Sequence, residues 1–212
     1  MPDGSATPFD MRVSNASFAK SCANKTDDVS LPEYVEAYRE LNKMFPLLGR
    51  LFNFVAKDID AKCVALSELM SKNATAYATV ASMISHETKE GILTSNPSGN
   101  GCRHLLRLHR ALLFLITFIK QVVSAPDSAK TSTLAIQAYE STIAQYHNWL
   151  MKKSVNLACR TLPEKVTLIE WLRGDMSASL AVPTMQKMVE TAGMVYDRIQ
   201  LMYQNNNLLD LP

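Results

Sequence analysis

Three groups of polar residues stand at short spacings in segments that are otherwise rich in apolar residues. The first is a carboxylate and an ammonium, Asp58 and Lys62, and the second is a pair of guanidinium groups, Arg103 and Arg107. The third is His147, with its imidazole, followed two residues later by Trp149. A four-residue step keeps both members of a pair on one face of a helix. One carboxylate, three cations and one imidazole would suit an anionic ligand that also carries an amide, and they predict a phospholipid head group.

The spacing of Asp58 and Lys62 also has a simpler interpretation. An i,i+4 ion pair on a helix surface stabilises the helix by about 0.2–0.5 kcal/mol and needs no ligand. On a helical projection, however, Phe52 and Val55 fall within about 120° of the pair, so an apolar stripe runs into the two charges. The surface pair and the ligand site both stay open, and Phe52 and Val55 are candidate pocket residues.

Arg103, Arg107, Arg110 and Phe114 share one helix face by the same arithmetic, and Phe118 continues its apolar end. Cations at the start of a helix oppose the helix dipole by about 0.3–1 kcal/mol each. A bound anion would relieve that conflict, and a phosphate would meet the positive end of the dipole together with guanidinium groups that match its geometry. Phe114 and Phe118 are further candidates for the apolar pocket.

His147 and Trp149 stand close together, and each has a structural alternative. A single histidine in an amphipathic segment is more often structural or exposed than a ligand. Trp149 precedes Lys152 and Lys153, a combination that suits a membrane interface. Trp149 could equally be a tryptophan of the hydrophobic core. Leu150 is the last candidate for the apolar pocket on helical spacing.

Helical periodicity dominates the whole chain, and no run of alternating residues predicts a strand. The chain is therefore expected to be all-α. Helices are expected over residues 9–23, 31–70 with a break at 46–49, 74–90, 102–124, 127–157 as one helix or two joined near His147, 163–171 and 182–204. Residues 91–101 are rich in glycine, asparagine and serine and predict a loop.

Composition excludes several classes of protein. The 212 residues are 47% hydrophobic and 20% charged, which predicts one domain over residues 1–212 with residues 1–8 flexible. The net charge of +2 without a basic stripe argues against a nucleic-acid partner. The longest apolar run, residues 111–119, is far short of the roughly 20 residues that cross a bilayer. Without a signal peptide pattern at residues 1–9, a cytoplasmic protein is expected.

Cysteine spacing and motif content argue against metal and enzyme chemistry. The four cysteines, at positions 22, 63, 102 and 159, form no C-x-x-C pair, which predicts reduced thiols. The chain lacks G-x-S-x-G, a P-loop, H-E-x-x-H and G-x-G-x-x-G. We therefore expect a protein that is not an enzyme and that uses no cofactor or metal.

Four stretches resemble the glycolipid transfer protein superfamily, and within it most closely the ceramide-1-phosphate transfer proteins. They are residues 52–62 (FNFVAKDIDAK), 101–112 (GCRHLLRLHRAL), 146–149 (YHNW) and 208–212 (LLDLP). The resemblance covers residues 9–212, and it is specific as a set. It implies an all-α, two-layer helical sandwich of about eight helices, which encloses an apolar pocket for ceramide chains and has a polar head-group site at its mouth.

The resemblance also implies a role for each polar residue. Asp58 would accept hydrogen bonds from the ceramide amide N–H and the sphingoid hydroxyl, while His147 would donate to the acyl carbonyl. Lys62, Arg103 and Arg107 would hold the phosphate. Glycolipid carriers of the superfamily have asparagine in place of Lys62 and tryptophan in place of Arg107, so both differences point to a phosphate instead of a sugar.

Two further expectations follow from the resemblance. Some phosphate-selective relatives have another basic residue just before the loop, where the region near Thr94 offers none. Arg110 is thus either a substitute cation or a structural residue. The match to Trp149 implies a tryptophan that docks on membranes.

The expected function is non-enzymatic transfer of ceramide-1-phosphate by a monomer that contacts the membrane surface transiently. Three alternatives stay open. They are a phospho-sphingolipid sensor or adaptor without net transfer, a glycolipid carrier, and a helical interaction module without a lipid, in which the charges form a solvated ion-pair network.

Overall fold

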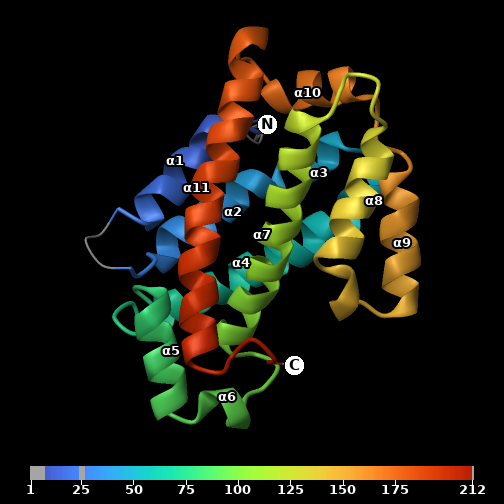
Figure 1. Ribbon diagram of the computed structural model, residues 1–212. Helices are drawn as coiled ribbons and strands as arrows, with labels where there is room; N and C mark the ends of the chain where they lie inside the picture. Colours follow the sequence, from blue (N-terminus) through green and yellow to red (C-terminus); the bar gives the residue numbers. More distant parts are fainter. Residues whose placement is uncertain (1–7, 24–26, 212) are drawn as a thin grey trace, which may run out of the picture.

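The computed structural model describes residues 8–23 and 27–211 and is built almost entirely from helices (Figure 1). The elements are α1 (Met11–Ser21), α2 (Leu31–Asn42), α3 (Met44–Leu47), η1 (Arg50–Phe52), α4 (Asn53–Lys72), α5 (Val80–Lys89), α6 (Ile92–Ser95), α7 (Gly101–Ser124), α8 (Thr131–Ser141), η2 (Ala144–Tyr146), α9 (Trp149–Cys159), α10 (Lys165–Arg173) and α11 (Ala178–Asn205). Within the described ranges there is no strand, only an isolated bridge between Ser30 and Thr79. The all-α prediction is confirmed.

The number of helices differs slightly from the expected eight. Nine α-helices in the described ranges have nine or more residues, and α3 and α6 are single turns of four residues each. Residues 1–7 of the segment expected to be flexible, and Pro212 of the terminal motif, lie outside the described residues.

Local signals explain several of the helix starts. Side chains cap the starts of four of the helices described. Asp10 accepts the N–H of Arg12 at 2.8 Å, Asn148 accepts that of Met151 at 2.9 Å, Asn100 accepts that of Arg103 at 2.7 Å, and Thr79 forms a capping box with Ser82. The cap at Thr79 also explains why α5 begins six residues later than the expected helix over 74–90.

The other differences from the sequence prediction occur at breaks and loops. The expected break at 46–49 becomes α3 and η1, and Gly49 between them has φ 113°, a backbone conformation that favours glycine. The segment 127–157 forms two helices, α8 and α9, which meet near His147 as one of the two alternatives predicted. The expected loop over 91–101 contains the single turn of α6.

The helices pack in two layers (Figure 1). In the front layer of this view α11, α7 and α8 lie side by side, and α2, α3 and α4 lie behind them. Contacts between α4 and α7 join the layers, α1 packs against α2 and α11, and α9 packs against α8. In the described part of the chain, no helix is both long and apolar enough to cross a membrane.

Buried tyrosines on α2 and α11 bond the central helix α7. The Tyr38 hydroxyl on α2 donates to the carbonyl of Leu108, and the Tyr203 hydroxyl on α11 donates to the carbonyl of Cys102 at 2.8 Å. Both tyrosines are fully buried, and Tyr38 packs edge-on against Phe18 with ring centroids 6.1 Å apart. The helix that carries the predicted arginines is thereby held from two sides.

Candidate lipid-binding site

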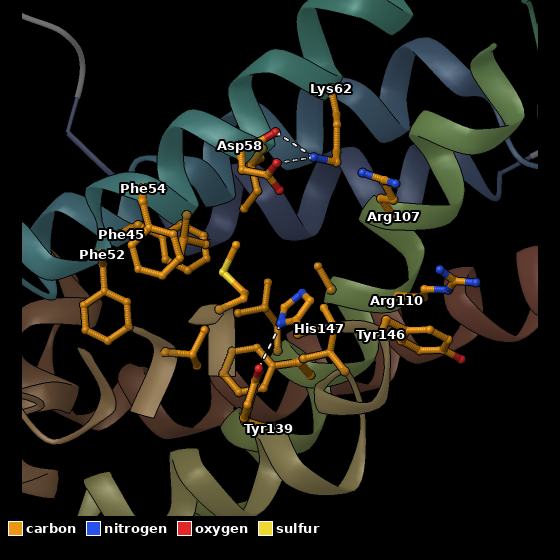
Figure 2. Close-up of a pocket in the computed structure, with 18 of the residues that line it drawn as sticks. Phe45, Phe52, Phe54, Asp58, Lys62, Arg107, Arg110, Tyr139, Tyr146 and His147 are labelled. Carbon is orange, nitrogen blue, oxygen red and sulfur yellow. Dashed lines mark hydrogen bonds and ion pairs between the residues drawn. The ribbon is translucent and has the colours of Figure 1, made fainter. Parts of the chain in front are cut away.

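A cavity of about 270 Å³ lies among α4, α7, α8 and α9. Figure 2 shows aromatic side chains at one end of its lining, those of Phe45, Phe52 and Phe54. The opposite end is polar. The polar and charged side chains that line the cavity are Asp58, Lys62, Arg107, Arg110, Tyr139, Tyr146 and His147. The cavity therefore suits a molecule with an apolar body and a charged end.

Asp58 and Lys62 lie on α4 and form an ion pair at the polar end. The Nζ atom of Lys62 lies 2.5 Å from Oδ1 of Asp58 and 3.2 Å from its backbone carbonyl. The Lys62 side chain is only 9% exposed, whereas that of Asp58 is 68% exposed. The pair is thus more than a solvated surface pair, because its ammonium faces the cavity. Two of the three N–H donors of Lys62 are used within the pair, which leaves one for a ligand.

Two of the three arginines of α7, Arg103 and Arg107, lie at different depths. Arg107 is exposed, lines the cavity and makes no hydrogen bond to another described residue. Arg103 lies one turn nearer the start of α7 and outside the lining, and its Nη1 atom donates to the carbonyl of Pro97 at 3.1 Å. Partial burial and the neighbouring charge of Arg107 lower the pKa of Arg103. The structure thus brings Asp58, Lys62 and Arg107 together at the cavity and leaves Arg103 outside its lining.

A buried carboxylate at the start of α7 corrects one argument from the sequence. Glu87 of α5 accepts the N–H groups of Gly101 at 2.6 Å and Cys102 at 2.9 Å. The Asn100 side chain accepts the N–H of Arg103 at 2.7 Å. The expectation that a bound anion relieves the conflict between the arginines and the helix dipole is wrong, because Glu87 already supplies a negative group there. These first N–H groups are occupied, so a phosphate would depend on side-chain cations.

His147 lies in an extended link between η2 and α9 instead of on a helix, with φ −107° and ψ 139°. Its ring is half-buried at the cavity, and its Nδ1 atom lies 2.9 Å from the Tyr139 hydroxyl. Burial lowers the pKa of His147, opposed by the Asp58 carboxylate and assisted by nearby lysines and Arg107. The imidazole is therefore neutral near pH 7 and can donate one N–H and accept one hydrogen bond.

Arg110 lines the cavity but already has two partners. Its Nη2 atom donates to the carbonyl of Leu209 in the C-terminal tail at 2.6 Å. The centre of its guanidinium group lies 3.8 Å from the centroid of the Tyr146 ring. These contacts favour the structural alternative for Arg110, as a link between α7, the tail and η2.

The predicted apolar residues divide into two groups. Phe52, Val55 and Phe114 line the cavity. Phe118 and Leu150 do not: Phe118 is buried beside Phe114 with ring centroids 6.1 Å apart, and Leu150 is 66% exposed.

The orientation of α9 explains the position of Leu150. Met151 and Val155, which sequence reasoning did not single out, share the inner face of α9 and line the cavity. Trp149 and Leu150 fall on its outer side as a result. The spacing of Met151 and Val155 was a usable signal, although nothing local shows which face of α9 turns inward.

Trp149 is a surface residue. Its side chain is 68% exposed at the first position of α9, and the Nζ atom of Lys153 lies 4.0 Å from its ring centroid. Its interpretation as a core tryptophan is therefore wrong. Leu150 beside it is also exposed, so an aromatic and an aliphatic side chain lie next to a cation on one surface.

Comparisons with known proteins agree with this architecture. The family model for Glycolipid transfer protein (GLTP) matches residues 29–174. Ceramide-1-phosphate transfer protein from Mus musculus is 33% identical over 217 residues, which cover 99% of this chain and 100% of that protein.

Two solved structures are similar over almost the whole chain. The apo form of mouse ceramide-1-phosphate transfer protein has a TM-score of 0.90 at 32% identity and covers 96% of this chain and 100% of that one. Human ceramide-1-phosphate transfer protein in complex with 12:0 ceramide-1-phosphate has a TM-score of 0.89 at 29% identity, with the same coverage. The chain belongs to the glycolipid transfer protein family.

Proposed function

We propose that this protein transfers ceramide-1-phosphate between membranes as a non-enzymatic carrier. The observation that supports this most strongly is the cavity itself, whose lining is aromatic and aliphatic at one end and cationic at the other. Relatives that match the chain over nearly their whole length are named ceramide-1-phosphate transfer proteins, and one is solved with that lipid bound.

In this proposal the polar end of the cavity recognises the head group. Lys62 and Arg107 hold the phosphate from two helices, and Arg103 reaches it from outside the lining of the cavity. Asp58 accepts from the amide N–H and the sphingoid hydroxyl through its Oδ2 atom, which has no partner among the described residues. His147 donates to the acyl carbonyl. Each cation about 4 Å from a phosphate contributes roughly 4 kcal/mol at an effective dielectric constant near 20, before desolvation.

The apolar end would shield the lipid chains from water. A ceramide with roughly 30 chain methylenes, at about 0.8 kcal/mol each, costs on the order of 20 kcal/mol to extract into water. A carrier removes most of this cost by replacing the bilayer interior with its own apolar side chains. Met151 and Val155 add flexible and branched aliphatic groups to the aromatic lining.

The proposal includes transient docking on the membrane surface through Trp149, with Lys153 beside it. An exposed indole ring is suited to the depth of the lipid head groups, and lysines meet anionic lipids there. We place the protein in the cytosol as a monomer, with residues 1–212 forming one lipid-transfer domain. No nucleic-acid partner and no cofactor are part of this proposal.

The experiment that tests the function measures transfer of fluorescent ceramide-1-phosphate from donor to acceptor vesicles at substoichiometric protein, with fluorescent glucosylceramide as the matched neutral lipid. We expect transfer of the phosphate lipid and little of the glycolipid. Transfer of the glycolipid would still indicate a lipid carrier, but it would contradict the roles of Lys62 and Arg107 in selecting a phosphate. Binding without net transfer would indicate a sensor, and the absence of both would indicate a lipid-free interaction module.

A further inference from the structure

Tyr139 is a buried residue of α8 that lines the cavity beside His147 (Figure 2). Its hydroxyl lies 2.9 Å from Nδ1 of His147, and it has no other hydrogen-bond partner among the described residues. Phe114 packs edge-on against the tyrosine ring, with centroids 6.5 Å apart and an interplanar angle of 84°. The phenol is thus held by packing and points at one nitrogen of the imidazole.

The direction of this hydrogen bond follows from what each group can offer. Burial raises the pKa of the Tyr139 hydroxyl to about 12, so the group keeps its proton at neutral pH. If His147 carried its proton on Nδ1, it would donate to the phenol oxygen, and the phenol proton would be left without an acceptor. A buried donor without a partner is unfavourable. The phenol therefore donates, and Nδ1 accepts.

We propose that Tyr139 is a positioning residue that holds the neutral ring of His147 in the tautomer with its proton on Nε2. Figure 2 shows the second ring nitrogen on the side of the ring away from Tyr139. This tautomer turns an N–H donor toward the cavity. The opposite tautomer would present a lone pair, which repels a carbonyl oxygen instead of binding it.

This inference rests on the proposed function, because it concerns the donor that His147 would offer to the acyl carbonyl of the lipid. Tyr139 would then contribute to the preference for a lipid with an amide group, although Tyr139 itself does not contact the acyl carbonyl. A lipid without a hydrogen-bond acceptor in place of the acyl carbonyl would not bind more tightly because His147 carries its proton on Nε2. Such a group acts by preorganising the donor that binds the ligand.

The test compares the tautomer and the transfer activity of matched variants. Tyr139→Phe keeps the ring and removes the hydroxyl. Tyr196→Phe is the control. That ring also contacts a histidine, stacking on His109 with centroids 4.1 Å apart, and among the described residues its hydroxyl bonds only Gln200, at 3.3 Å on its own helix. Long-range ¹H–¹⁵N correlation spectra of the full-length protein, labelled at histidine, report which ring nitrogen of His147 is protonated.

We expect a single Nε2–H tautomer of His147 in the wild-type protein and in Tyr196→Phe, and a mixture of tautomers in Tyr139→Phe. Transfer of ceramide-1-phosphate by Tyr139→Phe should fall about 3- to 10-fold, the effect of weakening one hydrogen bond to the ligand. The Tyr196→Phe variant should transfer like the wild type.

Three results would overturn the inference: a proton on Nδ1 in the wild type, an unchanged single tautomer in Tyr139→Phe, or full transfer by Tyr139→Phe despite a mixture. If the wild-type protein transfers no ceramide-1-phosphate, the proposed function fails instead. The tautomer comparison then still decides whether Tyr139 sets the protonated nitrogen, because it requires no lipid.

Discussion

Lys62 carries its charge in a nearly buried side chain, with Asp58 as its bonded partner. Removing an ammonium from water is costly unless opposite charge compensates it. Asp58 is itself mostly exposed, so water weakens the compensation that it provides. With Arg107 at the same end of the cavity, the site has more positive than negative charge. A phosphate would restore the balance, which is why we assign this end of the cavity to the head group.

Replacing Arg107 by leucine should lower transfer of ceramide-1-phosphate by roughly 10- to 100-fold, since a charge-assisted hydrogen bond contributes about 1.5–3 kcal/mol. The melting temperature should stay the same, because Arg107 is exposed and bonds no other described residue. Vesicle transfer assays and thermal unfolding measure the two effects.

The matched control is Arg39→Leu, which removes an exposed guanidinium group that bonds Ser67 at 2.7 Å and lies outside the cavity lining. It should transfer normally. Unchanged transfer by Arg107→Leu would refute the role of Arg107 in binding phosphate.

The burial of His109 predicts that the free energy of unfolding depends on pH. It is buried, its Nε2 atom bonds Gln200 Oε1 at 2.7 Å, and burial lowers its pKa to about 4. The unfolded chain has the ordinary value near 6.5. Between these values the unfolded state binds more protons, so the stabilisation is present above pH 6.5 and is lost as the pH falls toward 4, by about 3 kcal/mol in total.

Thermal unfolding at pH 7 and pH 5 checks this prediction. The wild-type melting temperature should fall more over this interval than that of His109→Gln, which has no titrating group at the position. Equal falls in the two proteins would show that His109 titrates normally in the folded state.

At the scale of elements, α7 organises the site. It contacts α4, α5, α8 and α11, and it carries two of the three phosphate candidates, Arg103 and Arg107, on its first two turns. Its start is set by Glu87 of α5, and hydroxyls from α2 and α11 bond its carbonyls. The arginines therefore project from a helix end that the protein supports with its own polar groups.

Replacing Glu87 by glutamine should destabilise the protein by about 1–3 kcal/mol, because the buried end of α7 loses its negative charge and one acceptor for an N–H group. For a chain of this size each kcal/mol corresponds to a fall in melting temperature of roughly 2–4 °C. Glu90→Gln, at the exposed position directly after α5, the helix that carries Glu87, is the matched control and should leave the melting temperature nearly unchanged. A similar effect of both changes would contradict the capping role of Glu87.

At the scale of the whole molecule, the cavity and the exposed tryptophan share α9. Met151 and Val155 on its inner face line the cavity, while Trp149 lies on its outer side. Docking through Trp149 would therefore bring a wall of the cavity to the membrane surface. A lipid could then pass between the bilayer and the cavity with little of its chain exposed to water.

The two tryptophans of the chain allow a direct test of docking. In Trp171→Phe, which retains Trp149, the emission should shift to shorter wavelength when vesicles with anionic lipid are added, because the indole enters a less polar region. In Trp149→Phe, the remaining Trp171, 42% exposed on α10, should show little shift. A shift in the Trp171 reporter alone would place the docking surface on α10.

The features predictable from the sequence were those encoded in short spacings. Helical periodicity predicted the all-α class, and a four-residue step placed Asp58 beside Lys62. Proline and glycine predicted the break between α2 and α4, while four short blocks of sequence indicated the family. Each of these depends on residues near one another in the chain. Because residues three or four apart lie on the same face of a helix, such spacings can be interpreted from the sequence.

Tertiary structure alone decided the contacts between distant residues. It brought Glu87 to the start of α7, paired Arg110 with the carbonyl of Leu209, and turned Leu150 outward. It also placed His147 in an extended segment between two helices and brought the Tyr139 hydroxyl within hydrogen-bond distance of Nδ1 of His147. These outcomes depend on how helices pack and which face turns inward, and the helical period alone does not specify the neighbour against which a face is buried.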